Sequence, residues 1–181
     1  MTYSGRKVPQ RAGKQHYETM TLDEIKALPV ADVAAKDCVL LMWIVDSHVD
    51  QGLALAAHWG FTYKTLGFVW RKVKKTIDEE SYEDDGASSM GMGKWTRKEC
   101  EFCFLFTRGK PPRLSGGVRQ IINAPRREHS RKPDEAYDSI EALAGGPYLE
   151  LFARTRRPGW SAWGNQTDKF RKLPNEAEAL L

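Results

Sequence analysis

The chain of 181 residues contains 41% hydrophobic and 29% charged residues, a composition typical of a globular protein and not of a disordered tail or a fibrous repeat. Its longest uninterrupted apolar run, residues 38–45, is far shorter than the roughly 20 residues that span a bilayer. The polar N-terminus also lacks the apolar core of a secretory signal. We therefore expect no membrane span and a cytoplasmic location.

The net charge of +4 is unevenly distributed along the chain. Residues 1–17 contain Arg6, Lys7, Arg11 and Lys14 and no acidic residue, so we expect a basic N-terminal arm over residues 1–15. Further basic residues cluster at 71–75, 119–132, 154–157 and 169–172. Any one cluster is equally consistent with a solvated surface, but four of them together with the arm favour a polyanionic partner.

The first half of the chain predicts alternating helices and strands. Thr21 and Glu24 form a capping-box pattern, which predicts a short helix over residues 21–28. The uniformly apolar residues 38–45 predict a central strand covered on both faces. Helical spacing over 48–59, ended by Gly60, is followed by a strand pattern over 61–70. We expect these two strands to be parallel, with a right-handed crossover.

The second half of the chain continues the alternation of strands and helices after a segment that shows neither helical nor strand periodicity. Residues 73–94 predict a long loop that serves as a lid or a partner-binding segment or is disordered. Strands are expected over 101–107, 118–122 and 148–153, and a helix is expected to begin at Pro133 and to end before Gly145 and Gly146. The order of elements predicts an α/β domain with a largely parallel sheet.

The cysteines and histidines give no sign of a metal site. Cys100 and Cys103 lie three apart in a predicted strand, so they point to opposite faces and can neither chelate one ion nor form a ready disulfide. We expect both to be buried. The four histidines show no ligand spacing on one helix face. No bound metal is expected.

Functional residues are expected in the loops that follow strands. Glu150 stands in an otherwise apolar strand, where it either pairs with a nearby arginine or contacts a ligand. Asn165 and Gln166 supply amides suited to a ribose or a base edge. The segment 126–135 offers cations beside a helix start, an arrangement suited to a carboxylate or a phosphate.

The tryptophans and the missing motifs narrow the function further. Trp43 and Trp59 are expected in the core, whereas Trp95, Trp160 and Trp163 lie in glycine-bearing segments and are candidates for base stacking. The sequence contains no G-x-G-x-x-G, no G-x-x-x-x-G-K-[ST] and no G-x-S-x-G. Dinucleotide-binding, P-loop and hydrolase functions therefore lose their main support.

Five segments carry a resemblance to a known family. They read, in order, HYETMTLDEIKALPV, LLMWIVDSHVDQGLALAAHWGFTYKTLGFVWRK, GMGKWTRKECEFCFLFTRGK, APRREHSRKPDEAYDSIE and LELFARTRRPGWSAWGNQ. Together they resemble the S-adenosylmethionine-dependent adenine-N6 methyltransferases, the family of the mRNA adenosine methyltransferase catalytic subunit and its phage and bacterial relatives. The resemblance covers residues 16–170. It implies a Rossmann-like methyltransferase fold in circularly permuted order, with a domain over 16–173 and a tail over 174–181.

The resemblance also implies roles for individual residues, with S-adenosylmethionine as the cofactor. Lys132 resembles the lysine that holds the cofactor's carboxylate, and Asn165 with Gln166 resembles the pair that binds its nucleoside. The residues that resemble the cofactor strand are Glu150, Phe152 and Arg154. The residues expected on the substrate side are Trp95, Arg97, Arg126 and Arg127. No catalytic residue is assigned.

The sequence departs from the family pattern at its start. Members carry an Asp-Pro-Pro-Trp motif just before the position of Met1–Ser4, and Glu18 stands where relatives often have proline. In that motif a carboxylate and a prolyl carbonyl accept the hydrogens of the adenine amine, while the aromatic ring stacks on the extruded base. No acidic residue precedes Glu18 in this sequence.

Three hypotheses follow. The first is a methyltransferase that modifies adenine in nucleic acid, with DNA expected in preference to RNA. The second is a catalytically inactive module that binds nucleic acid or an active partner. The third is an α/β domain with an unrelated small-molecule role. A homodimer and a heterodimer both stay open.

Overall fold

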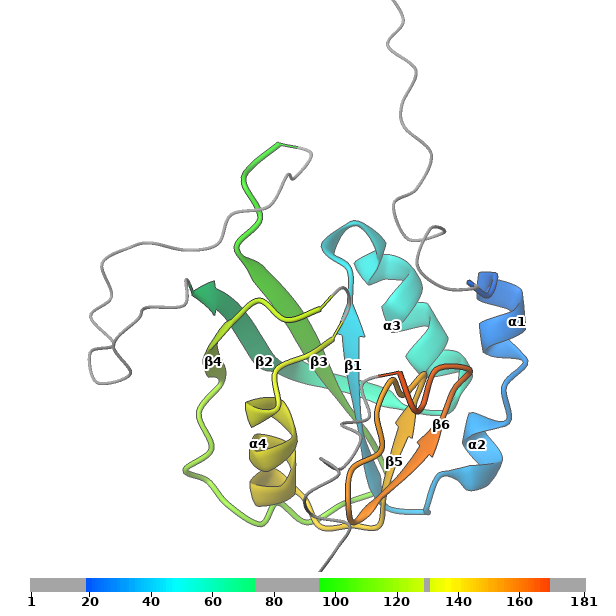
Figure 1. Ribbon diagram of the computed structural model, residues 1–181. Helices are drawn as coiled ribbons and strands as arrows, with labels where there is room; N and C mark the ends of the chain where they lie inside the picture. Colours follow the sequence, from blue (N-terminus) through cyan, green and yellow to red (C-terminus); the bar gives the residue numbers. More distant parts are fainter. Residues whose placement is uncertain (1–18, 74–94, 129–130, 170–181) are drawn as a thin grey trace, which may run out of the picture.

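The computed structural model describes residues 19–73, 95–128 and 131–169 (Figure 1). The elements are α1 (Leu22–Lys26), α2 (Val30–Val33), β1 (Cys38–Ile44), the 3-10 turn η2 (Asp46–His48), α3 (Val49–His58), β2 (Thr62–Val73), β3 (Cys100–Arg108), β4 (Ile121–Pro125), α4 (Glu135–Leu143), β5 (Tyr148–Leu151) and β6 (Trp160–Trp163). The predicted basic arm, most of the predicted loop over 73–94 and the predicted tail lie outside the described residues.

The main sheet is mixed, with the strand order β1-β3-β2-β4. β3 pairs antiparallel with both β1 and β2, while β2 and β4 are parallel. The prediction of a largely parallel sheet is therefore wrong for this sheet. β1 and β2 do run in the same direction, as expected, but β3 lies between them. A separate two-stranded sheet pairs β5 and β6 in parallel.

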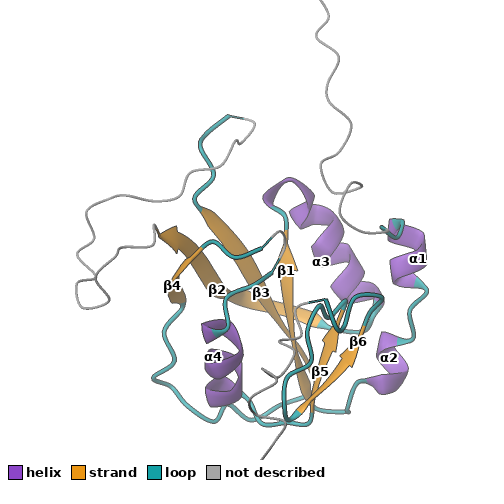
Figure 2. Cartoon of the chain, viewed as in Figure 1, coloured by secondary structure: helices purple, strands orange, loops and turns teal. Residues whose placement is uncertain are grey.

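Two hydrophobic clusters lie on opposite faces of the main sheet. One contains Phe106 and the other contains Cys103, two positions of β3 whose spacing of three places their side chains on opposite faces. The helices α1, α2 and α3 contribute to the first cluster, and α4 contributes Ala136 to the second (Figure 2). The result is a three-layer α/β arrangement in which helices flank both faces of the strands.

The strand β1 is less buried than its sequence predicts. Leu40 and Met42 pack against the first cluster and Leu41 and Trp43 against the second, so both faces are in contact with other residues. Only Ile44 is buried, however, because β1 is the edge of the sheet among the described strands. The expectation of a fully covered central strand is wrong on this point.

Local signals place several element boundaries correctly. The Glu24 N–H donates to Thr21 Oγ1 at 3.3 Å and the Thr21 N–H donates to Glu24 Oε2 at 2.6 Å, which confirms the capping box. Gly60 follows α3 with φ +83°, the left-handed conformation that glycine adopts without strain. Trp59 is buried at the end of α3, as predicted for a core residue.

Other boundaries differ from the predictions. The strand expected over 118–122 is β4, Ile121–Pro125. The strand expected over 148–153 ends at Leu151, because Phe152 adopts φ +60° and turns the chain away. Trp160 and Trp163 were expected in a loop but form the ends of β6, a strand confined to four residues between Gly159 and Gly164.

The two cysteines of β3 differ in burial. Cys103 is fully buried, as expected, whereas Cys100 is partly exposed, so the prediction of two buried cysteines is wrong for Cys100. Cys100 is the first residue of β3, where the strand begins to be covered. All three cysteines are free.

Two kinds of feature are absent from the described residues. No helix in the described ranges is long and apolar enough to cross a membrane. Within the same ranges, no three His, Cys, Asp or Glu side chains are grouped to hold a metal ion.

Candidate functional site

The ends of β5 and β6 bring most of the predicted cofactor residues to one edge. Leu151 pairs with Trp163 in the parallel register, so the chain leaves both strands at the same level. The segment 152–154 therefore begins beside the segment 164–166. Carboxyl ends of parallel strands are the usual position of ligand sites in α/β folds. We call residues 150–154 and 163–166 the strand-end cluster.

Close backbone contacts hold the strand-end cluster together. The Ala153 N–H donates to the Trp163 carbonyl at 2.9 Å. A Cβ at Gly164 would lie 2.9 Å from the Ala153 carbonyl oxygen, so a larger residue there would force the two segments apart. The rings of Phe152 and Trp163 meet edge to face at 5.5 Å, and both are about 45% exposed. Asn165 is exposed beside them.

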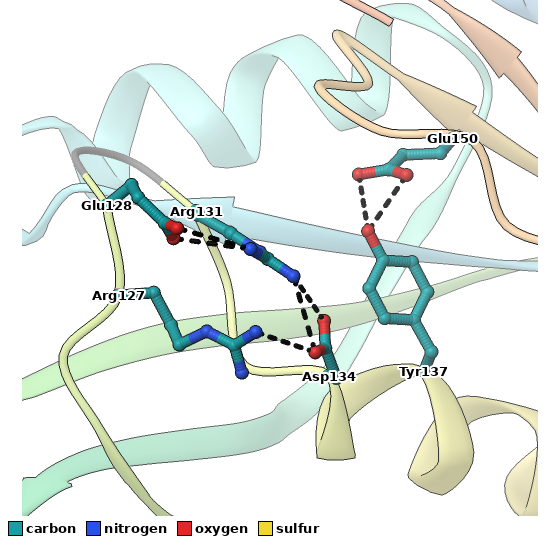
Figure 3. Close-up of polar contacts among 6 residues, drawn as sticks. All are labelled: Arg127, Glu128, Arg131, Asp134, Tyr137 and Glu150. Carbon is teal, nitrogen blue, oxygen red and sulfur yellow. Dashed lines mark hydrogen bonds and ion pairs between the residues drawn. The ribbon is translucent and has the colours of Figure 1, made fainter. Parts of the chain in front are cut away.

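Glu150 is held by a tyrosine and not by an arginine. Tyr137 in the first turn of α4 donates its hydroxyl to both carboxylate oxygens of Glu150, each at 3.0 Å (Figure 3). Burial raises the pKa of Glu150, and the hydrogen bond from Tyr137 opposes this only in part. Of the two alternatives for Glu150, a salt bridge to an arginine is wrong for the described residues, and a ligand contact stays a prediction.

A cavity of about 280 Å³ lies at strand ends of the main sheet, where β1 and β2 finish and β3 begins. Its wall combines aromatic rings and cations on strands with the segment that leads into α4. The lining residues are Trp43, Ile44, Val45, Asp46, Trp70, Lys72, Lys98, Glu101, Phe102, Arg126, Arg127, Glu128, Arg131 and Lys132. We call this the cationic cavity.

One carboxylate bridges two lysines in the wall of the cationic cavity. Lys72 lies 2.8 Å from one oxygen of Glu101, and Lys132 forms a short ion pair with the other. Burial works against ionisation of Glu101, but the charges and hydrogen bonds of Lys132 and Lys72 outweigh it and lower its pKa. Each lysine also lies over a tryptophan ring, Lys132 over Trp43 at 5.4 Å and Lys72 over Trp70 at 5.2 Å.

The segment before α4 carries a second set of ion pairs (Figure 3). Arg127 lies 2.9 Å from Asp134, the N-cap residue of α4. Arg131 lies between Glu128 at 3.3 Å and Asp134 at 3.4 Å. These contacts fix the basic residues 127 and 131 at one wall of the cavity and connect that wall to the start of α4.

The predicted site residues thus divide into three groups. Lys132, Arg126 and Arg127 line the cationic cavity, whereas the other five predicted cofactor residues belong to the strand-end cluster. Trp95 is 98% exposed and Arg97 is exposed, and neither lines this cavity.

Sequence reasoning missed four residues of these sites. Glu101 carries the same signal as Glu150, a single acid in an apolar strand, and the same argument applied to it would have found it. Lys72 lies in the basic run 71–75 that was noted only for its charge. Trp43 packs against the core, as expected, but it also lines the cavity, and Tyr137 was seen only as part of an apolar stripe.

Comparison with known proteins finds a match to one family model. The MT-A70 family model matches residues 4–166 of this chain.

Named relatives come from distant organisms. The chain is 32% identical over 166 residues to the type II methyltransferase M.MunI of Mycoplasma sp., a match that covers 90% of this chain and 65% of that enzyme. It is 30% identical over 164 residues to an N(6)-adenosine-methyltransferase MT-A70-like protein of Drosophila melanogaster, covering 88% of this chain and 26% of that protein. It is 29% identical over 167 residues to the human N(6)-adenosine-methyltransferase catalytic subunit METTL3, a match that covers 90% of this chain and 27% of that protein. The chain therefore spans less than two thirds of each relative's length.

Proposed function

The chain belongs to the MT-A70 family, and from this membership we propose that it transfers a methyl group from S-adenosylmethionine to the N6 amine of adenine in nucleic acid, DNA in preference to RNA. The observation that carries the proposal is the family match over residues 4–166, because it includes both the strand-end cluster and the cationic cavity. The names of the relatives, a type II methyltransferase and N(6)-adenosine-methyltransferases, support the reaction class.

The proposed fold is a Rossmann-like methyltransferase fold in circularly permuted order. Helices on both faces of the main sheet and the parallel pairs β2–β4 and β5–β6 support it. In the permuted order the cofactor strand stands near the C-terminus, and β5 is our candidate for that strand.

The strand-end cluster is the proposed site of the cofactor nucleoside. Its chemistry fits, because Asn165 offers an exposed amide that donates and accepts, Glu150 offers carboxylate acceptors, and Phe152 with Trp163 offers exposed aromatic faces. Lys132 is the proposed partner of the cofactor's carboxylate. When bound, S-adenosylmethionine would supply the methyl group from its sulfonium.

The cationic cavity is the proposed site of the target base. Its volume of about 280 Å³ is close to the lower end of the range for ligand sites, roughly 300–1,000 Å³, which suits one base extruded from a strand. Trp43 offers aromatic surface to such a base, and Arg126 offers positive charge to the phosphates beside it, whereas Lys98 is paired with Asp46 at 2.6 Å.

The test is methyl transfer from labelled S-adenosylmethionine by the full chain to duplex DNA, single-stranded DNA and RNA, with mass spectrometry of the product nucleosides. The proposal predicts N6-methyladenine, with more in DNA than in RNA. Binding of S-adenosylhomocysteine without product would favour the alternative of a non-catalytic module that binds nucleic acid or a partner. The absence of both S-adenosylhomocysteine binding and methylated product would overturn the proposal.

A further inference from the structure

Glu150 is a partly buried carboxylate that has no cationic partner among the described residues. It forms no ion pair with any residue that the structure describes, and its one polar contact there is the Tyr137 hydroxyl. An ionised carboxylate offers about four lone-pair sites, and the single proton of a tyrosine occupies one of them. The remaining acceptor capacity lies at the end of β5, two residues before Phe152.

The ring of Tyr137 is itself held by two neighbours. Its ring meets Trp160 edge to face at 5.1 Å, and the guanidinium of Arg157 lies 5.0 Å from the ring centre. Trp160 in turn stacks on Tyr148 at 4.6 Å. Burial and the nearby Glu150 raise the pKa of Tyr137, so its hydroxyl keeps its proton and acts as a donor near neutral pH.

The pair is costly for the fold. Burial raises the pKa of Glu150, which means that the charged form is disfavoured in the folded protein. A neutral amide of the same shape would avoid this cost and would still accept from Tyr137. A group that the fold disfavours, at a strand end beside exposed polar and aromatic residues, is more readily explained by a ligand than by stability.

We propose that Tyr137 is a positioning residue whose hydroxyl orients the Glu150 carboxylate, so that its free lone pairs accept hydrogen bonds from hydroxyl or ammonium donors of the cofactor. The inference rests on the proposed function, because it takes the strand-end cluster as the cofactor site. It adds a residue of α4 to a site otherwise built from β5, β6 and the segments that follow them.

The test compares three variants of the full chain by calorimetric titration with S-adenosylhomocysteine. Tyr137→Phe removes the hydroxyl and keeps the ring, and we expect its Kd to rise about tenfold, as for loss of a hydrogen bond to a charged group. Tyr148→Phe is the matched control: its hydroxyl donates to the Ala144 carbonyl at 2.8 Å and its ring stacks on the same tryptophan. We expect Tyr148→Phe to bind as the wild type does.

The pH dependence separates positioning from simple loss of structure. Wild-type affinity should fall as pH drops through the pKa of Glu150, because the protonated carboxyl loses acceptor capacity. The hydrogen bond from Tyr137 lowers that pKa, so Tyr137→Phe should move the fall in affinity to higher pH. Glu150→Gln should weaken binding and abolish this dependence. A structural defect would change the melting temperature without moving the pH profile.

The outcomes are distinguishable. If the wild type binds S-adenosylhomocysteine and Tyr137→Phe matches it in Kd and pH profile, the positioning role is wrong and the proposed function stands. If the wild type does not bind, the proposed cofactor site falls and this inference falls with it. If Tyr137→Phe does not fold, the Glu150→Gln variant provides the test. Unchanged affinity for S-adenosylhomocysteine and an unchanged pH profile in Glu150→Gln would overturn the proposed role of the Tyr137–Glu150 pair.

Discussion

Lys132 and Glu101 form an ion pair that connects the segment before α4 to the first residues of β3. The residues are far apart in the sequence, and the pair closes one wall of the cationic cavity. Because Lys72 contacts the other oxygen of the same carboxylate, Glu101 neutralises part of the cavity's positive charge. A single substitution of Glu101 therefore changes both the stability of the wall and the charge offered to a ligand.

Glu101→Gln should lower the free energy of unfolding by about 1–2 kcal/mol at pH 7, because it leaves two lysines of a half-buried cluster without their shared counter-charge. It should also strengthen the binding of short oligonucleotides, since both lysines then face the cavity uncompensated. Urea unfolding and fluorescence anisotropy measure the two effects. Glu99→Gln, two residues earlier, is the control. Equal stability of Glu101→Gln and the wild type would contradict the bridging role.

Glu150→Gln should raise the melting temperature at pH 7 and lose this advantage in acid. The pKa of Glu150 is raised in the folded protein, so its charged form costs stability above that pKa, and the cost disappears as pH falls below the unfolded value of about 4.5. Thermal unfolding of variant and wild type between pH 4 and pH 8 measures the difference. A difference that does not depend on pH would show that desolvation of the charge is not its cause.

Cys103 should resist alkylation in the folded protein. Burial raises the pKa of its thiol to about 12, so almost no thiolate forms at neutral pH, and the side chain is fully buried. Cys38 and Cys100 are partly exposed and should react first. Timed iodoacetamide labelling with peptide mass spectrometry measures the order. Labelling of Cys103 as fast as Cys100 without denaturant would contradict the described core.

Arg126→Ala should weaken DNA binding and reduce its salt dependence. Arg126 is exposed at the cavity and forms no ion pair with a described residue, so its charge is available to a phosphate. Removing one phosphate contact should lower the slope of log K against log salt by about 0.9. Lys64→Ala is the control, because Lys64 is an exposed cation near the other end of β2. An unchanged slope for Arg126→Ala would remove this residue from the nucleic-acid site.

The correctly predicted features depend on short-range signals. The capping box of Thr21 and Glu24 and the glycine after α3 are encoded within a few residues, and the structure confirms them. A lone acid in an apolar strand also singled out Glu150, but the arginine partner expected for it is wrong and the ligand contact stays a prediction. Its partner, Tyr137, lies on another element, so spacing along the chain could not identify it.

The errors concern relations between distant segments. The order of strands depends on where β3 inserts, and no local pattern shows that residues 100–108 pair on both sides with β1 and β2. Trp43 packs against the second hydrophobic cluster, as expected of a core residue, but its contact with Lys132 was missed for the same reason, because Lys132 comes from the segment before α4. The resemblance supplied residue roles but could not show that Lys132 lies in the cationic cavity and not in the strand-end cluster.

The central proposal is that the strand-end cluster and the cationic cavity form one methyltransferase site. Calorimetric titration of the full chain with S-adenosylhomocysteine tests it most directly, with Lys132→Ala and Asn165→Ala in parallel. Asn165 belongs to the strand-end cluster and Lys132 to the cationic cavity. We expect that the wild type binds and that each variant binds at least tenfold more weakly, roughly the effect of one lost hydrogen bond to a charged or sugar group. Wild-type affinity in both variants would contradict it.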